Sequence, residues 1–210
     1  AFIIILPMIC IVGQRETGSA LVYSAFFLMF YREGMPGSIL FTAVAMVVYF
    51  VVGVKYENVM MWDGQTSVGE FVVLLLVQIF STGMVSTYIH NGRQTVQMLL
   101  YTVGITLGCM LFSVYVIPFD VTYVQLIVSF VLIGFLFYQG LSSRIRNYYF
   151  IALFALGSLA FFYSADYVLN NVMEPHQRVR INVLLGLEED LAGAGYNVHQ
   201  SEIAIGSGGL

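Results

Sequence analysis

Six long apolar stretches, separated by short polar segments, constrain this chain more than any other feature of its sequence. They cover residues 18–31, 37–54, 68–89, 95–116, 121–141 and 148–169. Hydrophobic residues make up 59% of the chain and charged residues 10%, which is far from the composition of ordinary soluble domains. Backbone amides and carbonyls find no water inside a bilayer, so segments this apolar are expected to be α-helices. The sequence therefore predicts an all-α, polytopic integral membrane protein.

The two ends of the chain suggest a piece of a longer bundle. Residues 1–12 are apolar but have no basic flank, and at about 1.5 Å per residue they are too short to cross about 30 Å of hydrocarbon. We interpret them as the end of a truncated helix that precedes about six full spans. The expected organisation is a transmembrane helical bundle over residues 1–169 and a large extracytoplasmic loop over residues 170–210. Because Leu210 falls within a glycine-rich segment, we expect an internal fragment whose loop is cut before its end.

The charges of the polar segments alternate along the chain. Segments around Arg32, Arg93 and Arg144 lean basic, whereas those around Glu57 and Asp120, and the tail after residue 170, lean acidic. The positive-inside bias then places the basic segments in the cytoplasm and the tail outside. The net charge of −4 and the scattered acids leave no basic surface for nucleic acid. The expected partner surface is the lipid bilayer.

Metal and disulfide chemistry have little support in the sequence. Cys10 and Cys109 both lie within apolar stretches, and His176 and His199 show no ligand spacing. The acidic run at residues 188–190 is better explained as a solvated turn than as a cation cage. We therefore predict no metal ligands from the residues themselves.

Two arginines in the tail are the first candidates for binding chemistry. Arg178 and Arg180 follow Gln177 directly after the last apolar stretch. In an extended segment both side chains would share one face, and in a helix they would diverge by roughly 200°. A pair of guanidinium groups suits the oxygens of a diphosphate, while anchoring to lipid headgroups explains the same residues equally well.

Two further polar segments are candidates. Glu16 lies in a turn between apolar segments, where a carboxylate must be paired or hydrated; a simple polar turn is the competing explanation. Near the end of the chain, Gln200 and Ser201 lie between two glycine-rich segments. Their mixture with apolar neighbours favours a short helix at the membrane interface.

These segments together resemble the SEDS family of membrane glycosyltransferases, to which RodA and FtsW belong and which polymerises lipid II into peptidoglycan. The resemblance is carried by three segments, which are Gln14…Glu16-Thr17-Gly18-Ser19-Ala20, Gln177-Arg178…Arg180-Ile181, and Gly193-Ala194-Gly195-Tyr196…Gln200-Ser201…Ile203-Ala204-Ile205-Gly206-Ser207-Gly208-Gly209-Leu210. The last is similar to the family's large extracytoplasmic loop and is closer to RodA than to FtsW. Arg15 and Glu16 replace the Pro-Asp that is usual in the family's early turn.

The resemblance implies a peptidoglycan glycosyltransferase for cell elongation and cell shape, in the bacterial cytoplasmic (inner) membrane. The family's catalytic aspartate would lie beyond Leu210, so no catalytic residue is expected here and the fragment alone is expected to be inactive. Arg180, together with Arg178, would stabilise the diphosphate charge of lipid II. The further substrate-binding candidates are Gln177, Glu16, Gln200 and Ser201. A Mg or Mn ion is the implied cofactor, and a class B penicillin-binding protein is the implied partner.

Two other functions are weighed against this one. A lipid-precursor flippase or transporter should have paired ionisable residues near the bilayer midplane, but the apolar stretches contain chiefly Gln78, Gln97 and Gln125 as polar exceptions. Hydrogen bonds between helices are expected to satisfy these glutamines. A non-catalytic scaffold for a cell-wall synthase stays open, because the discriminating residues are expected outside the chain.

Overall fold

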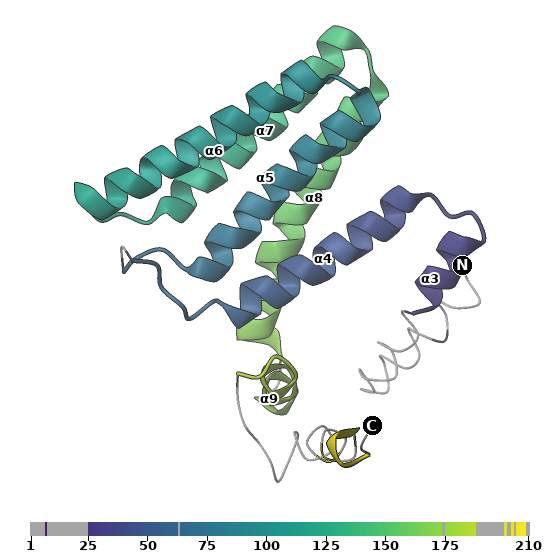
Figure 1. The fold of residues 1–210 in the computed structure, drawn as a ribbon, viewed down its shortest axis with the longest axis vertical. Coiled ribbons are helices and arrows are strands. Elements are labelled where there is room, and N and C mark those ends of the chain that lie inside the picture. Colours follow the sequence, from purple (N-terminus) through teal and green to yellow (C-terminus); the bar gives the residue numbers. More distant parts are fainter. Residues whose placement is uncertain are drawn as a thin grey trace. The chain divides into compact units, whose positions relative to one another are not determined.

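The computed structural model describes residues 7, 25–62, 64–173, 175–187, 200, 203 and 205–208. Its elements are α3 (Phe26–Arg32), α4 (Gly37–Lys55), α5 (Val68–Ile89), α6 (Gly92–Tyr115), α7 (Val121–Ser143), α8 (Arg146–Tyr167), the π-helix η1 (Val168–Val172) and α9 (Pro175–Leu184) (Figure 1). Within the described residues, the sole β-type pairing is an isolated bridge between Met60 and Ser67. The predicted all-α class is confirmed.

Among the residues that the structure describes, five helices are long and apolar enough to cross a membrane: Gly37–Lys55, Val68–Ile89, Gly92–Tyr115, Val121–Ser143 and Arg146–Val172. They coincide with five of the six predicted stretches, and their ends differ from the predicted ones by only a few residues. The remaining stretch, 18–31, is described only at its C-terminal part, where α3 lies. The predicted truncated helix at residues 1–12 lies outside the described residues except for Pro7.

The chain forms two compact units, Ala1–Val47 and Val48–Leu210, so α4 begins in the first and ends in the second. In the first unit, α3 is followed by a tight turn in which the Met35 amide donates to the Phe30 carbonyl over 2.9 Å. Gly34 has φ 100° in this turn, a conformation that favours glycine. The turn leads directly into α4.

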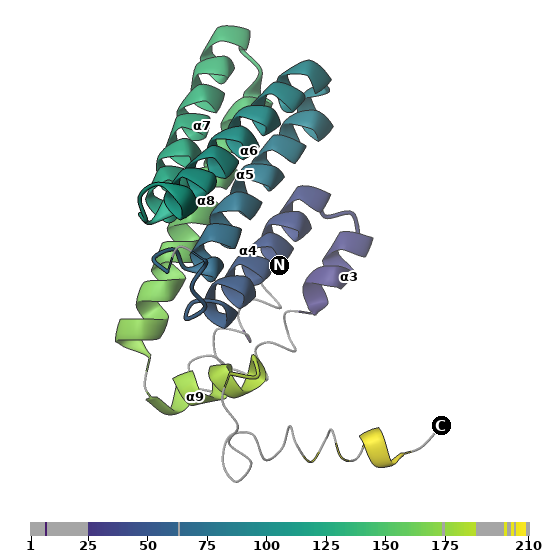
Figure 2. The ribbon, with the colours of Figure 1, turned by 60° about the vertical axis from the view of Figure 1, so that its left-hand side comes forward.

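In the second unit, α5, α6, α7 and α8 lie side by side as an antiparallel bundle (Figures 1 and 2). Short connections enforce this arrangement, since only His90 and Asn91 join α5 to α6, and only Arg144 and Ile145 join α7 to α8. Helix α5 contacts α6, α7 and α8 and is therefore the central helix. Its core side chains pack with those of α7 and α8, and the best buried are Val73, Leu74, Val77, Leu136 and Ile151.

Side chains at the helix starts explain where two of these helices begin. The Asn91 side chain accepts from the Gln94 amide over 3.3 Å at the start of α6. At the start of α7, the Asp120 side chain accepts from the Thr122 amide over 2.9 Å. Each cap satisfies a backbone donor that the first turn of a helix leaves without a partner.

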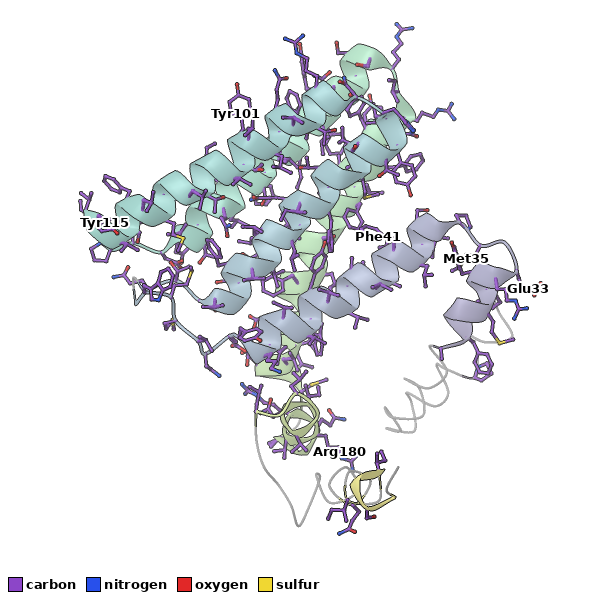
Figure 3. All side chains as sticks on the ribbon, viewed as in Figure 1. Glu33, Met35, Phe41, Tyr101, Tyr115 and Arg180 are labelled. Atoms are coloured by element: carbon purple, nitrogen blue, oxygen red, sulfur yellow. The ribbon has the colours of Figure 1, made fainter. Side chains whose placement is uncertain are left out.

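Polar and apolar side chains are distributed as expected for a bundle in lipid. Large apolar and aromatic side chains are exposed along the helices, among them Tyr101 and Tyr115 of α6 (Figure 3). The bundle interior contains the polar residue Gln78, whose Nε2 donates to the Gln125 carbonyl over 3.2 Å and to Ser129 Oγ over 3.0 Å. These bonds join α5 to α7, which confirms the interhelical bonding predicted for Gln78.

The other two glutamines differ from that prediction. Gln125 is fully buried, but its side-chain oxygen and nitrogen have no hydrogen-bond partner among the described residues; only its backbone carbonyl takes part in the α5–α7 contact. Gln97 is exposed on α6. Apolar sequence context alone does not distinguish a helix position that faces a neighbouring helix from one that faces outward.

Candidate functional site

The two ends of the helical bundle differ in charge. One end is formed where α4 ends, α5 and α7 begin and α8 ends, and we call it the acidic end (Figure 1). It holds all the acidic side chains that the structure describes in the second unit: Glu57, Glu70, Asp120 and Asp166. The opposite end holds three arginines: Arg93, Arg144 and Arg146. The basic and acidic segments thus separate as predicted, and which end faces the cytoplasm stays a prediction.

A cavity of about 180 Å³ lies at the acidic end. Its lining combines carboxylic acids with aromatic rings: Glu57, Glu70, Asp166, Phe50, Phe162 and Tyr163. The Tyr163 hydroxyl faces the Glu70 carboxylate, which also lies within electrostatic range of Asp120. Gathered carboxylates of this kind attract cationic and hydrogen-bond-donating groups.

One such donor comes from α9. The Asn170 Oδ1 accepts a hydrogen bond of 2.7 Å from the Arg178 guanidinium. The Nδ2 of the same amide donates to Asp166 Oδ1 over 2.9 Å and to Glu57 Oε1 over 3.3 Å. Arg178 is therefore linked to two carboxylates of the acidic end through a single side chain.

The structure decides between the extended and the helical conformation considered for the segment that carries Arg178 and Arg180. Residues Pro175–Leu184 form the helix α9, so Arg178 and Arg180 point in directions that differ by roughly 200°. Arg180 is exposed and has no hydrogen-bond or ion-pair partner among the described residues, and Figure 3 shows it on α9. A clamp in which both guanidinium groups share one face of the segment is therefore wrong for this helix.

The remaining predicted residues lie in different places. Gln177 is half-buried on α9, and Gln200 is exposed in a residue that is helical. Glu16 and Ser201 lie outside the described residues, as does the acidic run 188–190. The structure thus brings Gln177, Arg178 and Arg180 together on one helix and gives no relation between them and the early turn.

Sequence reasoning missed Asn170 and treated Glu57 only as a loop charge. One sequence signal is available, because Asp166 and Asn170 are four residues apart and therefore share one face of a helix. The contact between Asn170 and Glu57 joins residues separated by 113 positions, and no local pattern reveals it. The same holds for the approach of Arg178.

No three His, Cys, Asp or Glu side chains converge to hold a metal ion in the part of the chain that the structure describes. The carboxylates of the cavity lining are therefore not a cation cage in this geometry. The Mg or Mn ion implied by the family resemblance stays a proposal.

Comparisons with known proteins agree with the fold. A helical bundle with at least five apolar spans among its described residues defines a multi-pass membrane protein. The family model described as cell cycle protein FtsW/RodA/SpoVE matches residues 68–210, more than half of the chain. The chain belongs to the FtsW/RodA/SpoVE family, which confirms the resemblance seen in its motifs. The matched range includes α9 and the glycine-rich tail but not Glu16.

Individual relatives match over different lengths. The peptidoglycan glycosyltransferase RodA of Treponema pallidum is 27% identical over 208 residues, which cover 99% of this chain and 38% of that protein. The peptidoglycan glycosyltransferase MrdB of Escherichia coli K12 is 40% identical over 75 residues, which cover 36% of this chain and 18% of that protein. No solved structure matches the chain. The chain therefore spans well under half of the length of these relatives.

Proposed function

We propose that this chain is part of a peptidoglycan glycosyltransferase that polymerises lipid II into glycan strands during cell elongation. The observation that carries the proposal is membership of the FtsW/RodA/SpoVE family, together with relatives that are named peptidoglycan glycosyltransferases. The helical bundle is consistent with this proposal, because an enzyme that acts on a lipid-linked substrate has to bind it in the bilayer or at its surface. In this proposal the acidic end and α9 face away from the cytoplasm at the inner membrane.

Arg180 is the residue of the described chain that we assign to the substrate. Transfer of the sugar releases a lipid diphosphate, and the negative charge on that diphosphate grows as the glycosidic bond breaks. Arg180 is exposed and has no partner among the residues that the structure describes, so its guanidinium is available to bond two oxygens of the diphosphate. Placed above the membrane, where the dielectric constant is lower than in water, such a bond stabilises the transition state more than the substrate.

The proposal extends to groups outside the described residues. Other parts of the complete protein would supply the general base that acts on the acceptor hydroxyl. They would also bind a Mg or Mn ion and the partner, a class B penicillin-binding protein. Glu16, Gln200 and Ser201 stay substrate-binding candidates on their motifs. Gln177, half-buried beside Arg178 on α9, would position the arginines.

The alternative functions have less support. In the described spans of the second unit, charged side chains lie at or near the helix ends, whereas a transporter places ionisable groups near the midplane. A scaffold without activity is disfavoured by the names of the relatives. Lipid II polymerisation by the complete protein separates an enzyme from both alternatives, and an inactive wild-type protein would contradict the proposal.

Substitution of each arginine tests the assignment of Arg180. In the complete protein, Arg180→Ala is expected to lower kcat/KM for lipid II by about 10²-fold, the size typical of losing one donor to a developing negative charge. Arg93→Ala is the matched control, since Arg93 lies at the opposite end of the bundle, and it should keep wild-type turnover. Unchanged turnover with Arg180→Ala would remove this residue from the mechanism.

A further inference from the structure

Asn170 joins three elements at the acidic end of the bundle. It lies in η1, the π-helix that continues α8, where the Met173 amide donates to the Val168 carbonyl over 2.9 Å. Its side chain bonds to Arg178 of α9, to Asp166 of α8 and to Glu57 in the loop after α4. This exposed amide therefore makes a polar connection between the helix that carries Arg180 and the end of the bundle.

The chemistry at this position requires an amide. Arg178 can only donate, and the two carboxylates can only accept, so the residue between them must accept on one side and donate on the other. Asparagine supplies both functions on adjacent atoms. An aspartate would keep the bond to Arg178 but would place a third carboxylate against Asp166 and Glu57, and an alanine would remove all three bonds.

The position of Asn170 also separates the roles of the two arginines. Arg178 is engaged by Asn170 at 2.7 Å, so its guanidinium is committed to the protein. Arg180 is two residues further along α9 and points roughly 200° away from Arg178 around the helix axis. A bond that fixes Arg178 toward the bundle consequently fixes the rotation of α9 and turns Arg180 outward.

We propose that Asn170 is a positioning residue: by holding Arg178 it sets the rotation of α9 and orients Arg180 toward the diphosphate of the lipid substrate. π-helical turns occur frequently at functional sites, which fits the placement of this residue in η1. The inference rests on the proposed function for the direction in which Arg180 acts. It assigns no contact with the substrate to Asn170 itself.

The first experiment compares Asn170→Ala and Asn171→Ala in the complete protein. Asn171 is the matched control because it neighbours Asn170 in η1 and, among the described residues, its side chain bonds only to the Tyr167 carbonyl one turn earlier, over 3.2 Å. Asn170→Ala is expected to lower kcat/KM for lipid II by about fivefold to tenfold, the size of one typical intramolecular hydrogen bond. Asn171→Ala should match the wild type. Equal values for the two variants would overturn the inference.

A double-variant cycle distinguishes positioning from a general loss of structure. If Asn170 acts through Arg180, then adding Asn170→Ala to Arg180→Ala should change kcat/KM by less than about twofold, because the residue being positioned is already gone. If Asn170→Ala lowers kcat/KM by the same factor in the Arg180→Ala background as in the wild type, then Asn170 merely supports the fold. That result would overturn the inference.

Exchange of two side chains provides a rescue test. Asn170→Asp alone should be impaired, since its carboxylate faces Asp166. The double variant Asp166→Asn with Asn170→Asp restores a donor at residue 166 opposite an acceptor at residue 170 and keeps the acceptor for Arg178, whereas Glu57 still faces a carboxylate. It should therefore recover part of the lost kcat/KM. A double variant as impaired as Asn170→Asp alone would contradict the proposed bond.

A binding measurement keeps the inference testable if the proposed function fails. Binding of undecaprenyl diphosphate to the complete protein in nanodiscs requires no turnover. Asn170→Ala should weaken this binding by about fivefold relative to the wild type and Asn171→Ala should not. A wild-type protein that binds the diphosphate but does not polymerise lipid II would refute the glycosyltransferase and leave this comparison valid. Equal binding by both variants would overturn the positioning role.

Discussion

At the scale of single residues, the bundle is stabilised by polar side chains that bond across helices. Gln78 is nearly fully buried and donates from α5 to two acceptors on α7. Its own carbonyl accepts from Thr82 Oγ1 over 2.7 Å, one helical turn later. In lipid, where apolar burial does little to drive helices together, such bonds contribute to helix association directly.

Replacement of Gln78 tests this contribution. Gln78→Leu keeps most of the side-chain volume and removes both bonds to α7, so the free energy of unfolding should fall by about 0.6 to 1.7 kcal/mol. Gln97→Leu is the control, because Gln97 is exposed on α6. The measurement is reversible unfolding of both variants in detergent micelles. Equal stability of the two variants would show that the α5–α7 bonds contribute nothing measurable.

At the scale of elements, glycine allows α4 and α5 to approach closely. The Gly69 amide, at the start of α5, donates to the Tyr56 carbonyl over 3.0 Å. A Cβ atom at Gly69 would lie 2.6 Å from the Gly53 carbonyl oxygen and 2.9 Å from the Tyr56 carbonyl carbon. These atoms belong to the backbone and cannot rotate away. The beginning of α5 therefore depends on the absence of a side chain at this position.

A pair of glycine substitutions on the same helix tests this dependence. Gly69→Ala should destabilise the bundle by about 1–3 kcal/mol through overpacking against backbone. Gly83→Ala, also in α5, has nothing within 4 Å of the added Cβ and should be neutral or stabilising by up to about 1 kcal/mol, since alanine favours helix more than glycine does. Thermal unfolding in detergent measures both. The opposite order of stabilities would contradict the close contact.

The helices themselves were predictable at this scale, whereas the geometry of the tail was not. Long apolar runs and short polar breaks locate α4 to α8 within a few residues. Arg178 and Arg180 are compatible with either an extended segment or a helix, so the sequence left open whether they share a face. The helical conformation of α9 decides this, and with it which arginine is held by Asn170.

At the scale of the whole molecule, the antiparallel bundle gathers charges from distant segments. Glu57 and Glu70 lie beside the connection between α4 and α5, and the chain returns to this end after every two spans, at Asp120 before α7 and at Asp166 at the end of α8. Arg93, Arg144 and Arg146 meet at the other end by the same geometry, whereas Lys55 and Arg178 lie at the acidic end. The two ends of the bundle therefore differ in net charge, and the orientation in the membrane is predicted from the charges of the loops.

Single cysteines at the two ends test the orientation of the complete protein. In a background from which Cys10, Cys109 and any other cysteine of the complete protein have been removed, Asn171→Cys should react with an impermeant thiol reagent in spheroplasts, because η1 is expected outside the cytoplasm. Ser142→Cys, near the end of α7 at the arginine-rich end, should react only after lysis. The reverse pattern would invert the topology and remove the proposed access of Arg180 to an outer-leaflet substrate.

The sequence by itself determined that the chain is a bundle of membrane helices and that its motifs belong to one family. It did so because hydrocarbon leaves few alternatives to a helix, and because the residues within each motif are close together along the chain. Only the tertiary structure decided that Gln78 bonds to α7 and that Asn170 links Glu57, Asp166 and Arg178. Those contacts depend on the rotation of each helix and on residues far apart in the chain, and neither follows from hydrophobicity.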